Sequence, residues 1–98
     1  MKTIEEIKQK RDTELQGMEE RYRARQDEVA QEKETVKAEA EEKHSKGENI
    51  DKDLDRYQKL QEHEDKNFDN YKEGRDEVWN YHQKEIDSIE KENEEQEK

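Results

Sequence analysis

The helical character of the sequence is interrupted at Ser45-Lys46-Gly47-Glu48-Asn49, and an apolar seven-residue repeat runs on each side of this break. Before the break, the repeat consists of Leu15, Tyr22, Val29 and Val36, with Ile4 and Met18 on a neighbouring row. After the break, it consists of Ile50, Leu54, Tyr57, Phe68, Tyr71, Val78 and Ile89. Apolar side chains that alternate in steps of four and three residues are the pattern of a coiled coil.

The two repeats match if the chain folds back on itself at the break. Residues whose numbers sum to 93 then face one another, which pairs Val36 with Tyr57, Tyr22 with Tyr71, Leu15 with Val78, and Ile4 with Ile89. The predicted fold class is therefore all-α, with two long helices forming an antiparallel coiled-coil hairpin.

Local signals place the ends of both helices. Thr3 and Glu6 form a capping box that starts a first helix over about residues 3–44. Gly47 suits a turn over residues 45–49, and Asn49 caps a second helix over about residues 50–92. Residues 93–98 contain no apolar side chain, so we expect a frayed acidic tail there. Residues 1–98 are thus predicted to form a single helical hairpin.

The composition limits the stability of such a hairpin. Of the 98 residues, 52% are charged and only 23% are apolar, and the net charge is −11. This composition approaches that of disordered chains, but the absence of Pro and the sustained repeat favour a folded hairpin. Polar side chains also occupy the predicted interface, among them Arg25, Glu32 and Glu39. Two helices alone bury little apolar area, so we expect self-association, such as a homodimer, or a partner to complete the structure.

Composition also bears on compartment and partner. The chain contains no Cys, which excludes disulfides and thiolate metal sites. No apolar run resembles a signal segment or reaches membrane-spanning length, so we expect a cytoplasmic protein that does not enter a membrane. The negative charge disfavours direct binding to nucleic acid, which is itself a polyanion. The expected partner is therefore a basic or helical protein.

The residue types of catalytic sites do not come together in the predicted hairpin. His44, His63 and His82 lie too far apart along the helices to share a metal, and Ser45 and Ser88 have no base nearby. Carboxylates on a wet, convex surface are not tuned for acid–base work. The sequence therefore predicts that the protein is not an enzyme and holds no metal or cofactor.

Surplus apolar side chains occur at the predicted open end of the hairpin, where both termini meet. Ile7, Trp79, Tyr81 and Ile86 fall beside the predicted interface rather than on it. With their neighbours they form a candidate partner-binding surface, here called the terminal patch, which consists of Ile4, Ile7, Val78, Trp79, Tyr81, His82, Ile86 and Ile89. Trp and Tyr are enriched in binding hot spots. The alternative is that Trp79 and Tyr81 lie flat and merely cover the edge of the interface.

A second candidate surface is acidic. One row of it, Glu48, Asp55, Glu62, Asp69 and Asp76, recurs every seven residues on the outer side of the second helix, and Asp51, Asp65 and Glu73 fill gaps beside this row. These eight residues are here called the acidic ridge. Carboxylates on successive turns lie roughly 5–10 Å apart, a range that overlaps the phosphate spacing of a nucleic acid. The alternative is that the ridge only keeps a highly charged protein in solution. A full duplex mimic is disfavoured, because DNA carries one charge per ~1.7 Å of axis.

Two of the three glycines fall inside predicted helices. Gly17 and Gly74 lie at nearly the same level of the hairpin, and each costs about 1 kcal/mol relative to Ala in a helix. They either mark a shared bend or break of the helices or are simply tolerated.

Two functional hypotheses follow. The preferred one is a non-catalytic protein–protein interaction module that acts as an adaptor, scaffold or inhibitor through the terminal patch. The alternative is a nucleic-acid mimic that uses the acidic ridge to block the basic groove of a nucleic-acid-binding protein. Phage-encoded inhibitors of host proteins are one class of this size and charge.

Overall fold

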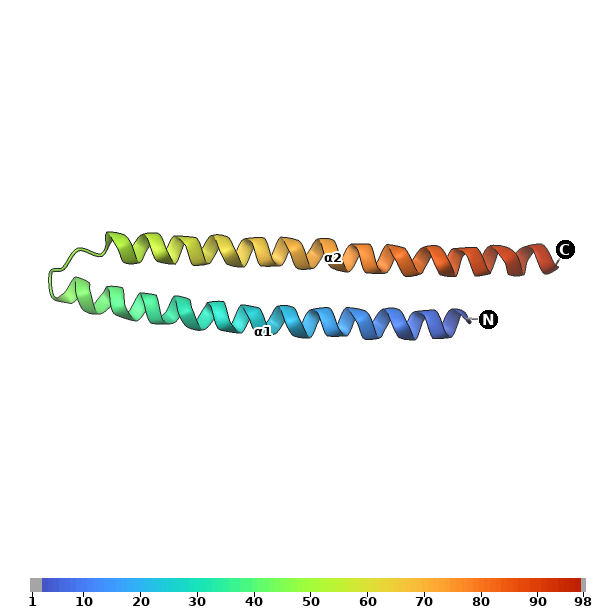
Figure 1. Ribbon diagram of the computed structural model, residues 1–98, viewed down its shortest axis with the longest axis horizontal. Coiled ribbons are helices and arrows are strands. Elements are labelled where there is room, and N and C mark those ends of the chain that lie inside the picture. The colour runs from blue at the N-terminus through green and yellow to red at the C-terminus, as the bar shows by residue number, and fades with distance from the viewer. Residues whose placement is uncertain (1–2, 98) are drawn as a thin grey trace. The chain divides into compact units, whose positions relative to one another are not determined.

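The computed structural model describes residues 3–97, which form two α-helices and no strand. Helix α1 spans Ile4–Ser45 and helix α2 spans Asp51–Glu97. Both helices continue without interruption through their glycines, Gly17 and Gly74, so neither glycine breaks its helix. The predicted all-α class, with two long helices in an antiparallel hairpin, is confirmed (Figure 1).

The contacts between the helices divide the chain into two compact units. Unit 1 contains residues 1–20 and 71–98, and unit 2 contains residues 21–70. Within each unit, a segment of α1 lies antiparallel to a segment of α2 (Figure 1). The expectation of a single structural unit stays a prediction.

Capping residues fix the helix ends as the sequence predicts. The Thr3 hydroxyl oxygen accepts a hydrogen bond from the backbone N–H of Glu6 at 3.2 Å, and the Asn49 side chain accepts one from the N–H of Asp51 at 2.8 Å. At the end of α1, Gly47 adopts a φ of 76°, a conformation that glycine reaches without a steric penalty. The N–H of Glu48 then donates to the carbonyl of Lys43 at 2.9 Å, which closes the helix end.

Helix α2 continues beyond its predicted end at about residue 92 and is helical through Glu97, although the side chains of residues 90–96 are exposed. The frayed tail expected over residues 93–98 stays a prediction. Glu, Gln and Lys have high helix propensity, and no Gly or Pro follows Gly74 to stop the helix. Lys98 lies outside the described residues.

In unit 2, one of the two predicted interface rows of α1 is wrong. Tyr22, Val29 and Val36 are covered as predicted, but Arg25, Glu32 and Glu39 are exposed. The covered row on the other side consists of Gln26, Lys33 and Ala40. The observed row is more favourable because it keeps two carboxylates out of the interface.

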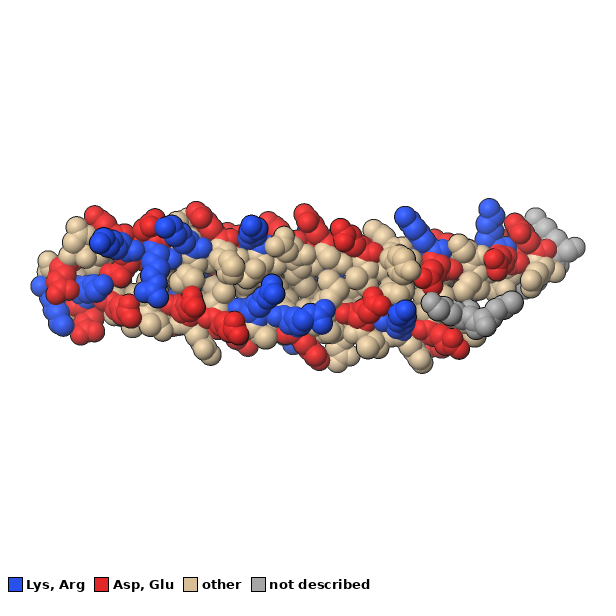
Figure 2. Space-filling view, viewed as in Figure 1, with Lys and Arg blue, Asp and Glu red and all other residues tan. Residues whose placement is uncertain are grey.

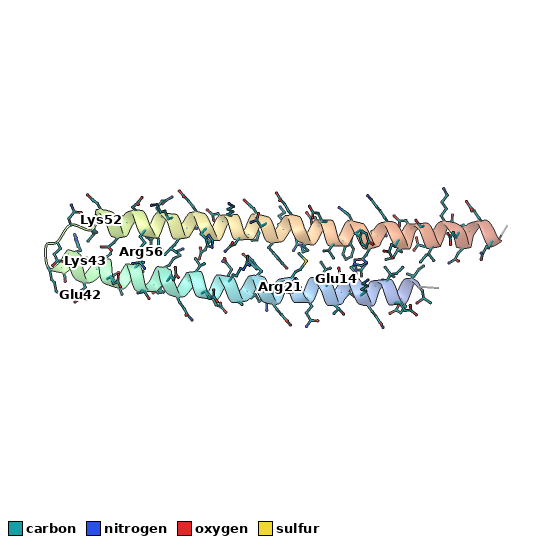
Figure 3. The ribbon with its side chains drawn as sticks, in the orientation of Figure 1. Glu14, Arg21, Glu42, Lys43, Lys52 and Arg56 are labelled. Atoms are coloured by element: carbon teal, nitrogen blue, oxygen red, sulfur yellow. The ribbon has the colours of Figure 1, made fainter. Side chains whose placement is uncertain are left out.

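In the same unit, α2 is rotated relative to the prediction. Leu54 and Phe68 were expected to face α1. Leu54 is 55% exposed, whereas the Phe68 ring lies 6.2 Å from the Tyr22 ring of α1 but is still 51% exposed. Asp53 is buried in place of Leu54 and pairs with Lys43 of the facing helix at 3.2 Å. Figure 3 shows Lys43 on α1 close to the loop that joins the helices. This rotation leaves apolar side chains of α2 on the surface of unit 2.

In unit 1, the centre of the interface consists of Ile7, His82 and Ile86, which are 3%, 2% and 2% exposed. This corrects the prediction that Ile7 and Ile86 lie beside the interface. The covered residues follow two successive four-residue steps here, from Ile7 to Leu15 on α1 and from Val78 to Ile86 on α2. Such a stutter shifts the interface away from a strict seven-residue repeat.

Candidate functional site

The structure separates the terminal patch into buried and exposed members, all in unit 1. Ile7, His82 and Ile86 are buried, whereas Ile4, Val78 and Ile89 are half-buried between the helices. Trp79 and Tyr81 are 44% and 64% exposed. Of the eight predicted residues, these two aromatic side chains present the most surface to a partner.

Trp79 and Tyr81 do not form one continuous surface. They are two residues apart on α2, so their side chains diverge by about 200° around the helix axis. The guanidinium of Arg11 lies 4.1 Å from the centre of the Trp79 ring, and the Tyr81 ring meets the His82 ring edge-on at 5.3 Å. Trp79 therefore covers Arg11 on one flank of unit 1, and Tyr81 covers His82 on the other. The terminal patch, which we expected to be one surface, is therefore divided into two aromatic flanks on opposite sides of α2.

His82 connects the two helices of unit 1. Its Nε2 atom lies 3.1 Å from a carboxylate oxygen of Glu14, which extends from α1 (Figure 3). Its Nδ1 atom is buried and has no hydrogen-bond partner. Among residues 3–97, no three His, Asp or Glu side chains are arranged to hold a metal ion. His82 is therefore a structural contact within unit 1 and presents no surface to a ligand.

All eight residues of the acidic ridge are exposed. Their charge is partly balanced, since Asp55 pairs with Lys59 at 3.2 Å on the next turn of α2. On the face shown in Figure 2, basic side chains are interspersed with acidic ones. The ridge is thus accessible, but it is not an unbroken row of negative charge.

Unit 2 contains a groove that the sequence reasoning missed. It has a volume of about 340 Å³ and lies between residues 36–44 of α1 and residues 50–57, which are Ile50 and the first two turns of α2. The exposed side chain of Leu54 and the Tyr57 ring form part of its lining. The sequence contains these apolar residues, but the strict seven-residue repeat assigned Leu54 and Phe68 to the helix interface. In the structure, the residues that directly precede them, Asp53 and Asn67, are covered instead.

A charged cluster crosses the helix interface of unit 2 beside this groove. The ammonium group of Lys33 donates to the Gln61 side-chain oxygen at 2.7 Å and to the Glu64 carboxylate at 3.1 Å, and it lies 5.0 Å from the centre of the Tyr57 ring. Burial acts to lower the pKa of Lys33, but Glu64 and Tyr57 more than offset this, so the pKa is raised above its ordinary value. Lys33 is therefore held in its charged form.

No family model matches the sequence, and comparisons with curated proteins and with solved structures gave no match. The described residues of the two units are therefore the guide to function. Across residues 3–97, neither helix has an apolar stretch long enough to cross a membrane.

Proposed function

We propose that this protein is a non-catalytic protein–protein interaction module, acting as an adaptor, scaffold or inhibitor. One observation carries the proposal. Although only 23% of the residues are hydrophobic, five large hydrophobic side chains among residues 3–97 are exposed: Leu54, Tyr57, Phe68, Trp79 and Tyr81. Apolar and aromatic side chains that a fold leaves outside its own core are typical of surfaces that contact another protein.

The partner contact proposed for unit 1 uses Trp79 and Tyr81. A helix or a groove of the partner would lie along α2 and cover one of these two aromatic flanks. Asp76 and Glu77 are exposed close by, so a basic partner would gain favourable charge pairs around the aromatic contact. This contact requires no chemistry, and the exposed carboxylates of the helices remain open to water.

The cytoplasm is the compartment we propose for this interaction. The chain has no Cys and thus needs no oxidising environment to fold. Helical contacts of the kind seen in both units form equally well under reducing conditions.

The acidic ridge supports a second candidate function, that of a nucleic-acid mimic that inhibits a nucleic-acid-binding protein. The observation in its favour is that all eight ridge residues are exposed. The Asp55–Lys59 pair weighs against it, because each balanced carboxylate weakens the resemblance to a phosphate row. We therefore rank this function second.

Capture of a partner from cell extract by the full-length chain tests the first function against the second. The chain is immobilised as wild type, Trp79→Ala, Tyr81→Ala and a variant in which Asp65 and Asp69 become Asn. If an aromatic flank binds the partner, one of the two alanine changes weakens binding by about tenfold or more, as is typical of hot spots. Binding should also survive an increase of salt from 0.1 M to about 0.5 M, because apolar contacts are not screened.

Asn80→Ala is the matched control for this capture experiment, because Asn80 is exposed between the two aromatic residues. It should leave binding unchanged, and circular dichroism should show that every variant is equally helical. A partner that is lost at high salt and with the two Asn changes, but not with either aromatic change, would support the nucleic-acid mimic. A partner insensitive to all of these changes would contradict both functions.

A further inference from the structure

The groove of unit 2 presents apolar surface that the two helices do not cover. Its apolar lining consists of Val36, Ala40, Ile50, Leu54 and Tyr57. Leu54 is 55% exposed, and Phe68, which is 51% exposed, lies two heptads further along the same flank of α2. The apolar surface therefore extends beyond the groove itself, over a length that suits a helix rather than a small molecule.

The charges of the groove suit a second copy of this chain. Lys37 and Glu41 stand about one turn apart on α1 within the lining, so their opposite charges balance. The third charged residue of the lining, Asp53, pairs with Lys43. Because each chain carries a net charge of −11, two copies repel one another over most of their surface. The groove is a face where that repulsion is locally absent.

Two-fold symmetry converts this balance into attraction. In a symmetric contact, residue i of one copy meets residue j of the other, and j meets i. If the two α1 helices meet antiparallel about an axis level with Glu39, each Lys37 lies opposite Glu41 of the other copy. Two equivalent ion pairs then form.

The same axis brings apolar residues of the groove together. In unit 2, the Glu39–Arg56 and Lys43–Asp53 ion pairs place Tyr57 close to the level of the axis, and Leu54 lies about one turn of α2 away from it. Both residues line the groove, so the two copies of Tyr57 approach one another across the axis, with one copy of Leu54 on either side. Ala40 is small enough at this level for the helices to approach closely.

We propose that the protein forms a two-fold homodimer through the groove of unit 2, with reciprocal Lys37–Glu41 pairs that set its register. This inference goes beyond the partner contact proposed for unit 1 and does not depend on it. The dimer would cover Leu54 and Tyr57 and leave Trp79 and Tyr81 available for a different protein.

Sedimentation equilibrium of the full-length chain tests this dimer. The wild type should have twice the chain mass of 12.0 kDa. Lys37→Glu and Glu41→Lys should each weaken dimerisation by about tenfold or more, because each creates two like-charge contacts. The double variant, with both changes, should restore the wild-type affinity, because the pairs form again with reversed polarity.

The two single changes also separate local pairing from general repulsion. Lys37→Glu makes the chain more negative by two charges and Glu41→Lys makes it less negative by two. General repulsion would therefore move the two dissociation constants in opposite directions, whereas the proposed pairs weaken the dimer in both cases. Both side chains are exposed, so neither change is expected to disturb the helices.

Glu42, near the end of α1, and Lys46, just after that end, provide the matched control, since they form an exposed ion pair at 3.2 Å and do not line the groove. Lys46→Glu should leave the dissociation constant of the dimer unchanged, as should Trp79→Ala, whereas Leu54→Ser should abolish the dimer. A wild type that stays monomeric up to about 0.5 mM would overturn the proposal, because such a contact would be weaker than about 4–5 kcal/mol. Failure of the double variant to restore the dimer would also overturn it.

Discussion

Lys33 illustrates how a charged residue can occupy a helix interface in a chain with few apolar ones. Its side chain is 14% exposed, and it makes three cross-helix contacts in unit 2, with Gln61, Glu64 and the Tyr57 ring. Burying an ammonium group costs free energy unless its N–H donors find acceptors and its charge is balanced. Here the Gln61 amide oxygen and the Glu64 carboxylate accept hydrogen bonds, and the carboxylate balances the charge. Lys33 is one of eleven basic side chains before Gly47, and nothing in the sequence distinguishes it from the others. Only the contacts between the helices show that it lies in the interface.

The raised pKa of Lys33 predicts a loss of stability in alkali. Because the pKa in the folded state exceeds that of the unfolded chain, the contribution is complete below the unfolded value. It is lost as the pH rises through the folded value, above pH ~10.5. Urea unfolding at several pH values between about 8 and 11.5 should therefore show the wild type losing stability relative to Lys33→Arg, whose guanidinium stays charged. A constant difference between the two proteins across this range would contradict the assignment.

At the scale of the helices, the same substitution at two glycines should have opposite effects. A Cβ atom on Gly74 would lie 2.9 Å from the terminal carbon of Met18, which can move because it is the end of a flexible side chain. Gly74→Ala should thus stabilise unit 1 by up to about 1 kcal/mol, through helix propensity. Gly47 has a φ of 76° and no atom near its Cβ position, so Gly47→Ala should destabilise by about 1–2 kcal/mol.

Thermal unfolding followed by circular dichroism measures both glycine effects on one scale. A destabilising Gly74→Ala would mean that Met18 cannot move and that the close approach of the helices there is fixed. A neutral Gly47→Ala would mean that the connection between α1 and α2 can adopt another conformation at no cost. The two variants serve as controls for one another, because each adds one methyl group.

The rows that the sequence predicted correctly show what a seven-residue repeat can determine. Tyr22, Val29 and Val36 face α2 because a regular apolar row leaves one side of a helix to bury. The neighbouring rows were misplaced because a heptad repeat admits a companion row on either flank. The choice in unit 2 depends on pairs between helices, such as Lys43–Asp53. In unit 1 it depends on stutters, which bring Ile7 and Ile86 to the centre.

The candidate sites follow the same logic. Trp79 and Tyr81 were identified by residue type alone and are indeed exposed, but their divergence by about 200° means that residue type could not define one surface. The groove of unit 2 was missed because Leu54 was assigned to the interface. In a strongly charged chain, an apolar residue indicates a binding surface most clearly when the facing helix does not cover it, as with Leu54.

At the scale of the whole chain, the charge distribution opposes folding at low ionic strength. Residues 48–98 carry 18 acidic and 9 basic side chains, whereas residues 1–47 carry 13 and 11. Compaction therefore brings like charges together, mainly along α2. Exposed ion pairs such as Lys46–Glu42 and Lys59–Asp55 act in the opposite direction, but each contributes only about 0.2–1 kcal/mol.

Self-repulsion at a net charge of −11 should outweigh these pairs, so we expect the melting temperature to rise with added salt. Raising NaCl from about 0.01 M to about 0.1 M shortens the screening length from about 30 Å to about 10 Å. Circular dichroism at a fixed protein concentration measures the shift, because self-association would itself raise the melting temperature as concentration increases. A variant in which Asp65 and Asp69 become Asn should melt higher than the wild type at low salt and show a smaller salt response. A melting temperature that falls with salt would mean that the ion pairs, and not the excess of acidic side chains, dominate the electrostatics of this chain.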